Sequence, residues 1–315
     1  MKQIFVFAFW LSEARPTSWS ETRRIIDALR ERVKELPLPP QRLIDAIGGG
    51  DGDAIGQEVL RQLLVLTDLH PGARVLEPGC GFGRNARWLS TYLNSSGSFD
   101  GFDIVPELVK WGQHHITPAH PNVRLQVAHI VKSHYMTWLK VPPVASAVPA
   151  ESLRWPYADQ SFDLTFNPSV FTHVTFRVLE NYLREAYRTL RPGGQALFWF
   201  FVLDDDAKTS LSTRLDSFPE GMRMTRFDEV SYALQAAPEA AIAFDESYLR
   251  RTLEATGFMH RVTIKGGWRA PGASPSAAQP AALRGPSWEV VGPNYVRPVP
   301  PSFQDIILVR RPQSR

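Results

Sequence analysis

The fold of this chain is decided by the stretch RVLEPGCGFGRN at residues 74–85, in which an apolar run leads into three alternating glycines. A short apolar run followed by glycines and then by a helix-length segment is typical of a strand–turn–helix unit. Glycines let the backbone turn tightly and approach a ligand without a clash at Cβ. The start of the following helix adds unpaired N–H groups. This stretch therefore predicts a turn that binds an anion or a nucleoside.

A second acidic strand end follows in SFDGFD, residues 98–103, where Asp103 comes 24 residues after Gly79. A carboxylate at the tip of the second strand can accept hydrogen bonds from both hydroxyls of a ribose. A dinucleotide fold normally reads G-x-G-x-x-G, whereas here the glycines alternate and Asn85 stands where a further glycine would be expected. A glycine-rich turn alone is weak evidence for a nucleoside-binding site. With Glu77 and Asp103 at these distances, the evidence becomes strong.

Working outward, residues 71–203 alternate short apolar runs with helix-length segments, which is typical of a parallel sheet covered by helices on both faces. We predict an α/β fold with a Rossmann-like seven-stranded sheet, a helical N-terminal extension and a cap. The predicted strands are 74–77, 98–103, 123–128, 164–167, 195–203, 260–266 and 305–310. The predicted helices are 20–35, 55–66, 84–92, 106–115, 176–190 and 245–256.

Four regions follow from this pattern. Residues 1–70 form a helical extension or lid, and 71–203 form the cofactor-binding core. Residues 204–243 carry no strand signal and are interpreted as a substrate cap. Residues 244–315 add a helix and the last strands, interrupted at 269–301 by an insertion rich in Pro, Ala, Gly and Ser.

Composition excludes several classes of protein. The net charge is +3, and the 35 Lys and Arg residues are scattered, so we expect no nucleic-acid partner. The single cysteine, Cys80, allows no internal disulfide, and a reducing cytoplasm is the expected location. The apolar run at residues 4–11 is too short for a convincing signal peptide. No run reaches the roughly 20 apolar residues of a membrane span.

Five motifs in order resemble those of class I S-adenosylmethionine-dependent methyltransferases of the bacterial small-molecule type. The resemblance covers about residues 60–310. The motifs are VLEPGCGFGR at 75–84, GFDIVP at 101–106, PYADQSFD at 156–163, SVFTH at 169–173 and LRPGG at 190–194.

The resemblance implies S-adenosylmethionine as cofactor and a small molecule as methyl acceptor, with secondary metabolism as one setting. It implies that the glycine turn holds the methionine part, Asp103 the ribose and Ile104 the adenine, while Glu77 acts on the amino end. The expected cofactor-binding residues are Glu77, Gly79, Cys80, Gly81, Gly83, Asn85, Asp103, Ile104, Ala128, His129 and Asn167. No metal site is expected, and a homodimer is left open.

The third strand departs from the family, which usually ends it in an Asp that contacts the adenine amino group. Here Ala128 and His129 occupy that position, and a neutral His accepts only one such bond. Glu151, four residues before Trp155, is the alternative; it requires residues 130–149 to loop out and return. Strand position favours His129.

Methyl transfer is an in-line displacement, so the protein chiefly positions the acceptor, and a general base helps where the acceptor must lose a proton. His173, after the fourth strand, is the candidate base, although it could instead hold the loop by bonding to backbone. His129, His134 and Tyr135 are rivals. The run at 204–206 could grip a cation but is interpreted as a solvated loop or helix cap.

Two other functions stay open. A nucleic-acid or protein methyltransferase would be favoured by an Asn-Pro-Pro-aromatic motif, but Ser169 and Val170 stand after Asn167 and Pro168. The second alternative function is a non-catalytic module that senses the cofactor. The complete set of glycines in the turn, together with Asp103, indicates that cofactor binding is retained.

Overall fold

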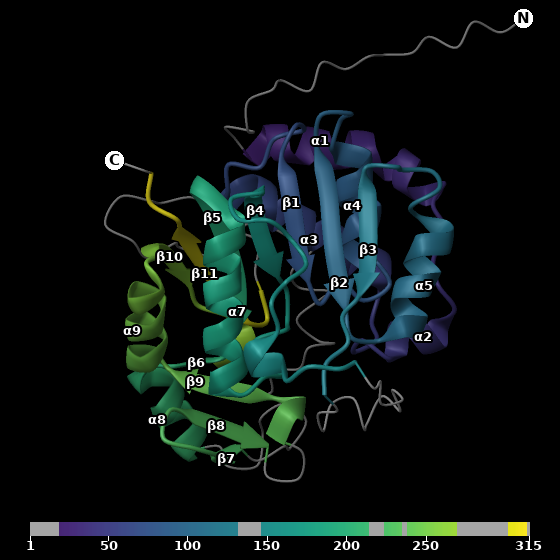
Figure 1. Ribbon diagram of the computed structural model, residues 1–315. Helices are drawn as coiled ribbons and strands as arrows, with labels where there is room; N and C mark the ends of the chain where they lie inside the picture. Colours follow the sequence, from purple (N-terminus) through teal and green to yellow (C-terminus); the bar gives the residue numbers. More distant parts are fainter. Residues whose placement is uncertain (1–18, 132–145, 214–223, 235–237, 270–301, 314–315) are drawn as a thin grey trace, which may run out of the picture.

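The computed structural model describes residues 19–131, 146–213, 224–234, 238–269 and 302–313. The apolar run at 4–11, the rival bases His134 and Tyr135, and nearly all of the 269–301 insertion lie outside these ranges. Within them the chain forms two sheets of unequal size (Figure 1).

The larger sheet has seven strands in the order β10-β11-β5-β4-β1-β2-β3. Strands β1 to β5 pair parallel with one another, and β11 pairs antiparallel with both β5 and β10, so six strands run in one direction and β11 in the other. The predicted Rossmann-like seven-stranded fold is therefore confirmed. The strands are β1 (Arg74–Pro78), β2 (Ser98–Asp103), β3 (Val123–Val127), β4 (Phe162–Asn167), β5 (Leu190–Phe200), β10 (Met259–Ile264) and β11 (Asp305–Arg310).

Helices cover both faces of this sheet, with α7 and α9 in front of it in Figure 1 and α3 and α4 behind it. Alternate side chains of β11 show the two faces directly, because Ile306 and Leu308 belong to one apolar cluster and Ile307 and Val309 to the other. A strand buried on both sides reads as an unbroken apolar run. The helices are α1 (Trp19–Lys34), α2 (Gln41–Asp45), α3 (Gly52–Leu66), α4 (Arg84–Tyr92), α5 (Pro106–His115), α7 (Phe176–Thr189), α8 (Asp205–Thr213) and α9 (Glu246–Thr256).

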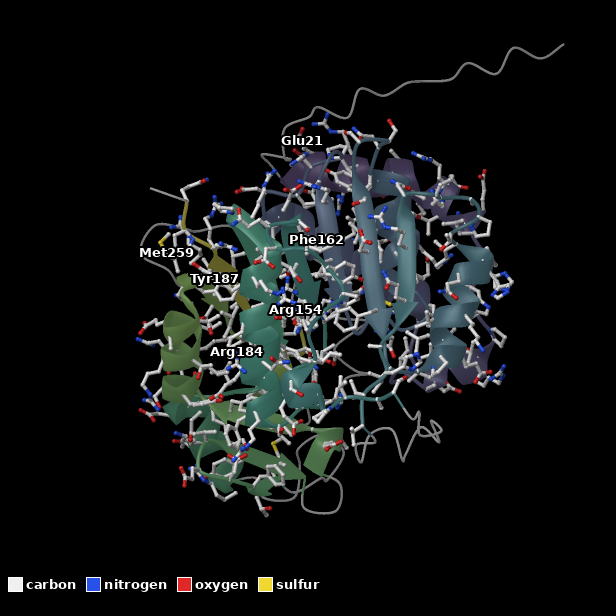
Figure 2. All side chains as sticks on the ribbon, viewed as in Figure 1. Glu21, Arg154, Phe162, Arg184, Tyr187 and Met259 are labelled. Carbon is white, nitrogen blue, oxygen red and sulfur yellow. The ribbon has the colours of Figure 1, made fainter. Side chains whose placement is uncertain are left out.

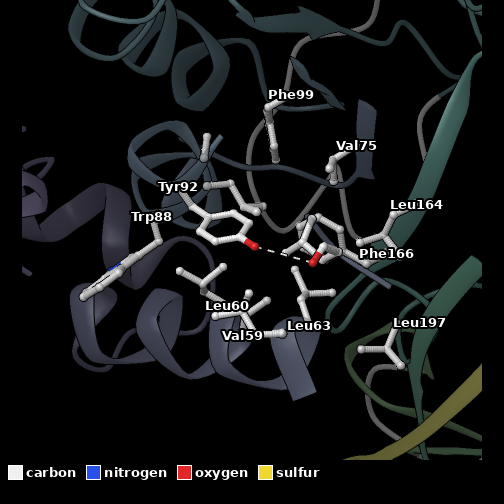
Figure 3. Packing of buried hydrophobic residues seen from close by; sticks show 14 of the residues in the cluster. Val59, Leu60, Leu63, Val75, Trp88, Tyr92, Phe99, Leu164, Phe166 and Leu197 are labelled. Atoms are coloured by element: carbon white, nitrogen blue, oxygen red, sulfur yellow. Dashed lines mark hydrogen bonds between the residues drawn. The ribbon is translucent and has the colours of Figure 1, made fainter. Parts of the chain in front are cut away.

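Figure 3 shows the cluster behind the sheet, in which Leu60 and Leu63 of α3 pack against Trp88 of α4 and against side chains of the strands. These three residues are at most 1% exposed. Each such side chain contributes roughly 1.5–3 kcal/mol by leaving water. The burial fixes α4, and with it the glycine turn at its start.

The N-terminal helices are held to the core by a buried guanidinium. Arg87 is 1% exposed and donates to Asp53 Oδ1 at 2.6 Å, to Val33 O at 3.1 Å and to Leu36 O at 2.9 Å. Because an unpaired buried charge is costly, the charge of Arg87 requires these three acceptors, and this requirement holds the N-terminal helices against α4. Helix α3 starts earlier than the predicted residue 55, since Asp51 accepts from two backbone N–H groups and caps it.

The prediction that residues 204–243 contain no strand is wrong. A second sheet, in the order β6-β9-β8-β7, is formed by β6 (Val202–Leu203), β9 (Ile242–Asp245), β8 (Ser231–Leu234) and β7 (Met224–Arg226). These strands are only two to four residues long, too short for alternation to be read, and β9 lies in the alanine-rich run EAAIAF at 239–244. Figure 1 shows this small sheet beyond the carboxyl ends of β4 and β5.

The predicted strand 195–203 is also corrected at both ends. β5 starts at Leu190, because Gly193 adopts a φ of +80° and donates to Arg311 O at 3.0 Å, which pairs this turn with the chain after β11. It stops at Phe200, and the chain crosses at Phe201 into the small sheet, where Phe244 N donates to Phe201 O at 2.9 Å.

Candidate functional site

The glycine turn between β1 and α4 has a shape that only glycine fits at two positions. Gly79 has a φ of +75°, and a Cβ there would lie 2.3 Å from Val170 Cγ2. Gly83 has a φ of +87°, and a Cβ there would lie 2.8 Å from Ile116 Cδ1. Both the handedness and the space exclude a side chain. The turn is thus built for close approach, on one side to the loop after β4.

Asp103, at the end of β2, is fixed by this turn. Its Oδ2 accepts from Gly81 N at 2.8 Å and its Oδ1 from Val105 N at 2.9 Å. Burial raises the pKa of Asp103, while these backbone N–H bonds act to lower it. The side chain is half-buried, so each oxygen keeps a lone pair that can accept a further bond from outside the protein. The sequence predicted a ribose-binding carboxylate here, and the geometry is suited to that role.

Glu77, at the end of β1, is 1% exposed and accepts at Oε1 from Asn85 Nδ2 at 2.6 Å. Burial raises the pKa of Glu77 to about 8, against the opposing effects of the Asn85 bond and of Arg84; Asp103 nearby raises it further. At neutral pH the unliganded protein therefore keeps this carboxyl mostly protonated. Arg84 was not among the predicted site residues.

Three buried acceptor oxygens near the ends of β1 and β4 have no hydrogen-bond partner among the described residues. They are Oε2 of Glu77 and the Oδ1 atoms of Asn85 and Asn167. Glu77 and Asn167 end neighbouring parallel strands, while Asn85 already contacts Glu77. An unmet buried acceptor is costly, so three of them near one sheet end call for an explanation such as a bound ligand or ordered water. A primary ammonium, with three N–H donors, is the chemical group that matches three acceptors.

The adenine side of the site is less defined. Ala128 N donates to Asp103 O at 2.8 Å, and both Ile104 and Ala128 pack at the edge of the apolar cluster in front of the sheet. His129 and Glu151 are both exposed, and neither side chain makes a hydrogen bond within the part of the chain described.

The chain does return beside β3, as the Glu151 alternative required. Ile130 and Val148 form a parallel bridge, and Val131 N donates to Val148 O at 2.8 Å. Glu151 then lies in the short helix η1 (Ala150–Ser152), which Asn181 of α7 anchors by bonds to Ala150 O and Leu153 O. The contact to adenine stays a prediction with two candidates.

His173 lies in the loop after β4 and contacts the small sheet. Its Nδ1 is 2.9 Å from Glu239 O, which as a carbonyl accepts, so Nδ1 carries the hydrogen. In the neutral ring Nε2 is then the basic nitrogen. Burial lowers the pKa of His173, against hydrogen bonds with the backbone of Glu239 and Ala240 that act to raise it. The contact with Glu239 O fits the predicted role of holding the loop, and the role of general base stays a prediction.

The acidic run at 204–206 caps a helix and pairs with a lysine. Asp204 Oδ1 accepts from Ala207 N at 2.8 Å and caps α8, and Lys265 pairs with Asp204 at 3.1 Å and with Asp206 at 3.0 Å. Across the described ranges, no group of three or more His, Cys, Asp or Glu side chains is arranged to hold a metal ion.

Besides Arg84, two parts of the site were missed by sequence reasoning. Gly101 in β2 gives room to Cys80, since a Cβ at Gly101 would lie 2.8 Å from Cys80 Cβ. Gln304, far away in sequence, donates to Ser169 Oγ at 2.6 Å. The close approach at Gly101 could have been suspected, because a glycine stands inside a strand. No local sequence signal indicates the contact between Gln304 and Ser169.

A largely parallel sheet with a glycine turn after β1, a carboxylate at the tip of β2 and unmet acceptors near the ends of β1 and β4 defines a Rossmann-like protein whose site is suited to a nucleoside bearing a cationic group. Comparisons with known proteins identify a domain within the chain. Residues 76–198 match the family described as "Methyltransferase domain". Residues 76–198 thus carry a methyltransferase domain, and the match supports the class I S-adenosylmethionine-dependent type, with S-adenosylmethionine as the cofactor.

Two curated relatives are similar over part of the chain. Methyltransferase GfsG of Streptomyces halstedii is 26% identical over 44% of this chain and 42% of its own length. Phosphoethanolamine N-methyltransferase 3 of Arabidopsis thaliana is 22% identical over 45% of this chain and 24% of its own length. The matches thus span less than half of either relative.

Among solved structures, the PH0226 protein of Pyrococcus horikoshii OT3 aligns with a TM-score of 0.50 at 14% identity. The alignment covers 85% of this chain and 93% of that one. At this identity the likeness shows the fold.

Proposed function

We propose that this chain transfers a methyl group from S-adenosylmethionine to an oxygen, nitrogen or carbon atom of a small-molecule acceptor. The glycine turn would hold the methionine part, the three unmet oxygens its ammonium, and Asp103 the ribose. When bound, the cofactor supplies an electrophilic methyl group. The residues of this chain then bind and orient it, and His173 would take a proton where the acceptor must lose one.

The observation that carries the small-molecule assignment is the position of the small sheet. It is fixed directly against the loop after β4, where Ile242 N donates to Thr172 O at 2.7 Å and His173 contacts Glu239. In a parallel α/β sheet, chemistry takes place at the carboxyl ends of the strands. A second sheet bonded to that end restricts access, which favours a small acceptor over a polymer.

Surface charge supports the same choice. In Figure 2 nitrogen and oxygen tips are mixed over the visible surface, and many described cations pair with acids, as Arg124 does with Asp100 at 2.6 Å. A nucleic-acid partner would favour a basic stripe. The curated relative named for phosphoethanolamine also points to a small acceptor.

Location and setting stay predictions. No described helix is both long and apolar enough to cross a membrane. The single, buried Cys80 is compatible with the reducing cytoplasm that we propose. A role in secondary metabolism and a homodimer remain predictions from the sequence.

The test combines binding and transfer. Calorimetry with S-adenosylmethionine is expected to show binding that Asp103→Ala weakens by more than about tenfold, because two ribose bonds to a charged acceptor are lost. An unchanged affinity would contradict the assignment of Asp103 to the ribose of the cofactor. Methyl-labelled cofactor is then offered with phenols, amines and sugars, and separately with RNA and protein. Label in the small molecules supports the proposal, label in a polymer contradicts it, and binding without any transfer indicates a sensing module.

A further inference from the structure

Ser169 has a backbone conformation that a residue with a side chain rarely adopts. Its φ is +71°, and the loop it belongs to leaves β4 directly after Asn167. Such a residue persists only where its surroundings fix it, and it is found preferentially at functional sites. The question is therefore which contacts hold Ser169 in place.

Two side chains do so. Gln304 Nε2 donates to Ser169 Oγ at 2.6 Å, and Thr172 Oγ1 donates to Ser169 O at 2.9 Å. Gln304 Nε2 also lies 3.4 Å from Thr172 Oγ1, so one amide reaches both hydroxyls of the loop. Ser169 and Gln304 are 135 residues apart in sequence. The loop is thus held from the far end of the chain.

Gln304 is itself rigidly anchored, because it precedes Asp305, which is 0% exposed. Asp305 accepts from Val202 N, Gly266 N and Trp268 Nε1, each at 2.7 Å. A Cβ at Gly266 would lie 2.4 Å from the carbonyl carbon of Gln304, so the two backbones are in close contact. Because its backbone is fixed in this way, the Gln304 side chain can determine where the loop lies, instead of moving with the loop.

The loop carries two groups of the cofactor site. Asn167, before Ser169, contributes one of the unmet acceptors, and Val170, after it, fills the space above Gly79. A shift of Ser169 would move both. We propose that Gln304 is a positioning residue for the methionine end of the cofactor and that it acts through Ser169. This inference rests on the proposed function, since it assumes that the site binds S-adenosylmethionine.

The test compares two ligands by calorimetry, using the full chain. S-Adenosylhomocysteine carries the amino-acid end, whereas 5′-methylthioadenosine lacks it and keeps the nucleoside. Gln304→Met preserves volume and removes the donor. We expect it to weaken S-adenosylhomocysteine by about fivefold, the factor that corresponds to one neutral hydrogen bond. Binding of 5′-methylthioadenosine is expected to change by less than about twofold, since Asp103 and the adenine side are untouched.

Two further variants make the result specific. Ser169→Ala removes the hydroxyl and keeps the Cβ, so the backbone strain is unchanged. In this background Gln304→Met is expected to have only a small further effect, from loss of its 3.4 Å contact with Thr172. Gln113→Met is the matched control, because Gln113 Nε2 donates to Leu125 O at 2.8 Å away from the loop, and it is expected to leave both affinities unchanged.

Each other outcome is decisive. Wild-type affinity of Gln304→Met for S-adenosylhomocysteine would overturn the inference, as would equal weakening of both ligands or additive effects with Ser169→Ala. A wild-type chain that binds neither ligand would overturn the proposed function itself, so the two failures are distinguishable.

Discussion

Replacing Glu77 by Gln tests how the site recognises the amino end of the cofactor. The structure raises the pKa of Glu77 to about 8, mainly by burial, so about nine tenths of the unliganded protein carries a neutral carboxyl at pH 7. An ammonium pairs best with the ionised form. Binding at pH 7 is therefore expected to release about 0.9 proton from Glu77 in wild type, whereas the Glu77→Gln variant is expected to release none.

The affinity follows from the same values. Ionising Glu77 at pH 7 costs about 1.4 kcal/mol, because the pH is one unit below the pKa, and this cost falls as the pH rises. A hydrogen bond to a charged group is worth about 1.5–3 kcal/mol. Wild type is thus expected to bind S-adenosylhomocysteine more tightly than Glu77→Gln. The gap widens by about fivefold from pH 7 to pH 8 as the carboxyl ionises.

The assay is calorimetry in two buffers that differ in ionisation enthalpy, which yields the number of protons released. 5′-Methylthioadenosine is the matched control, since without an ammonium it is expected to release no proton from wild type. Equal proton release for the two ligands, or none for S-adenosylhomocysteine, would refute the pairing of Glu77 with the amino end.

Stability gives an independent reading of the same group. The folded state binds the proton of Glu77 more tightly than the unfolded state, whose carboxyl has a pKa near the ordinary 4.5. The free energy of unfolding of the unliganded chain therefore falls as the pH rises from 4.5 to about 8. Glu77→Gln removes this loss, so above pH 8 the variant is expected to melt at a higher temperature than wild type. A lower melting temperature there would contradict the raised pKa.

Two further predictions concern the acceptor and adenine sides. His173→Asn keeps a donor where Nδ1 bonds to Glu239 O but has no basic nitrogen. With an acceptor that must lose a proton, we expect kcat to fall by about 100-fold and the affinity for S-adenosylhomocysteine to stay the same. A wild-type kcat would leave His173 as a residue that only holds the loop. In wild type this activity is expected to fall only as the pH drops below the usual histidine range, because burial lowers the pKa of His173. His129→Ala and Glu151→Ala form a matched pair in calorimetry with adenosine, and the residue that binds the adenine amino group is the one whose loss weakens binding by about fivefold or more. If neither does, the predicted adenine contact is wrong at both positions.

The parts of the fold that sequence predicted well have strong local signals. The strand at 98–103 and the helices at 84–92 and 106–115 form with the predicted bounds. Glycine turns, a proline at the first turn of a helix and unbroken apolar runs are read within a few residues. The small sheet has no such signal, because a strand of three residues is stabilised by its partners and not by its own pattern.

The same distinction divides the site. On the cofactor side the deciding contacts join residues close in sequence, as Glu77 and Asn85 are eight apart and Gly81 and Asp103 are 22 apart. A motif can hold such pairs at a fixed spacing, so the sequence could single out these residues as candidates for the site, although not the contacts between them. In the loop after β4, by contrast, His173 reaches Glu239 across 66 residues and Ser169 is reached by Gln304 across 135. No spacing rule connects them, and only the folded chain brings them together.

This division has a consequence for specificity. The small sheet joins the core through backbone bonds such as Ile242 N to Thr172 O, which persist whatever side chains the sheet carries. Its outer side chains can therefore change without moving Glu77, the glycine turn or Asp103, and so without loss of the cofactor. The loop after β4 is different, because Ser169 is held by Gln304 while Val170 touches Gly79. Substitutions in the small sheet are thus expected to alter the choice of acceptor, whereas substitutions at Ser169 or Gln304 alter binding of the methyl donor.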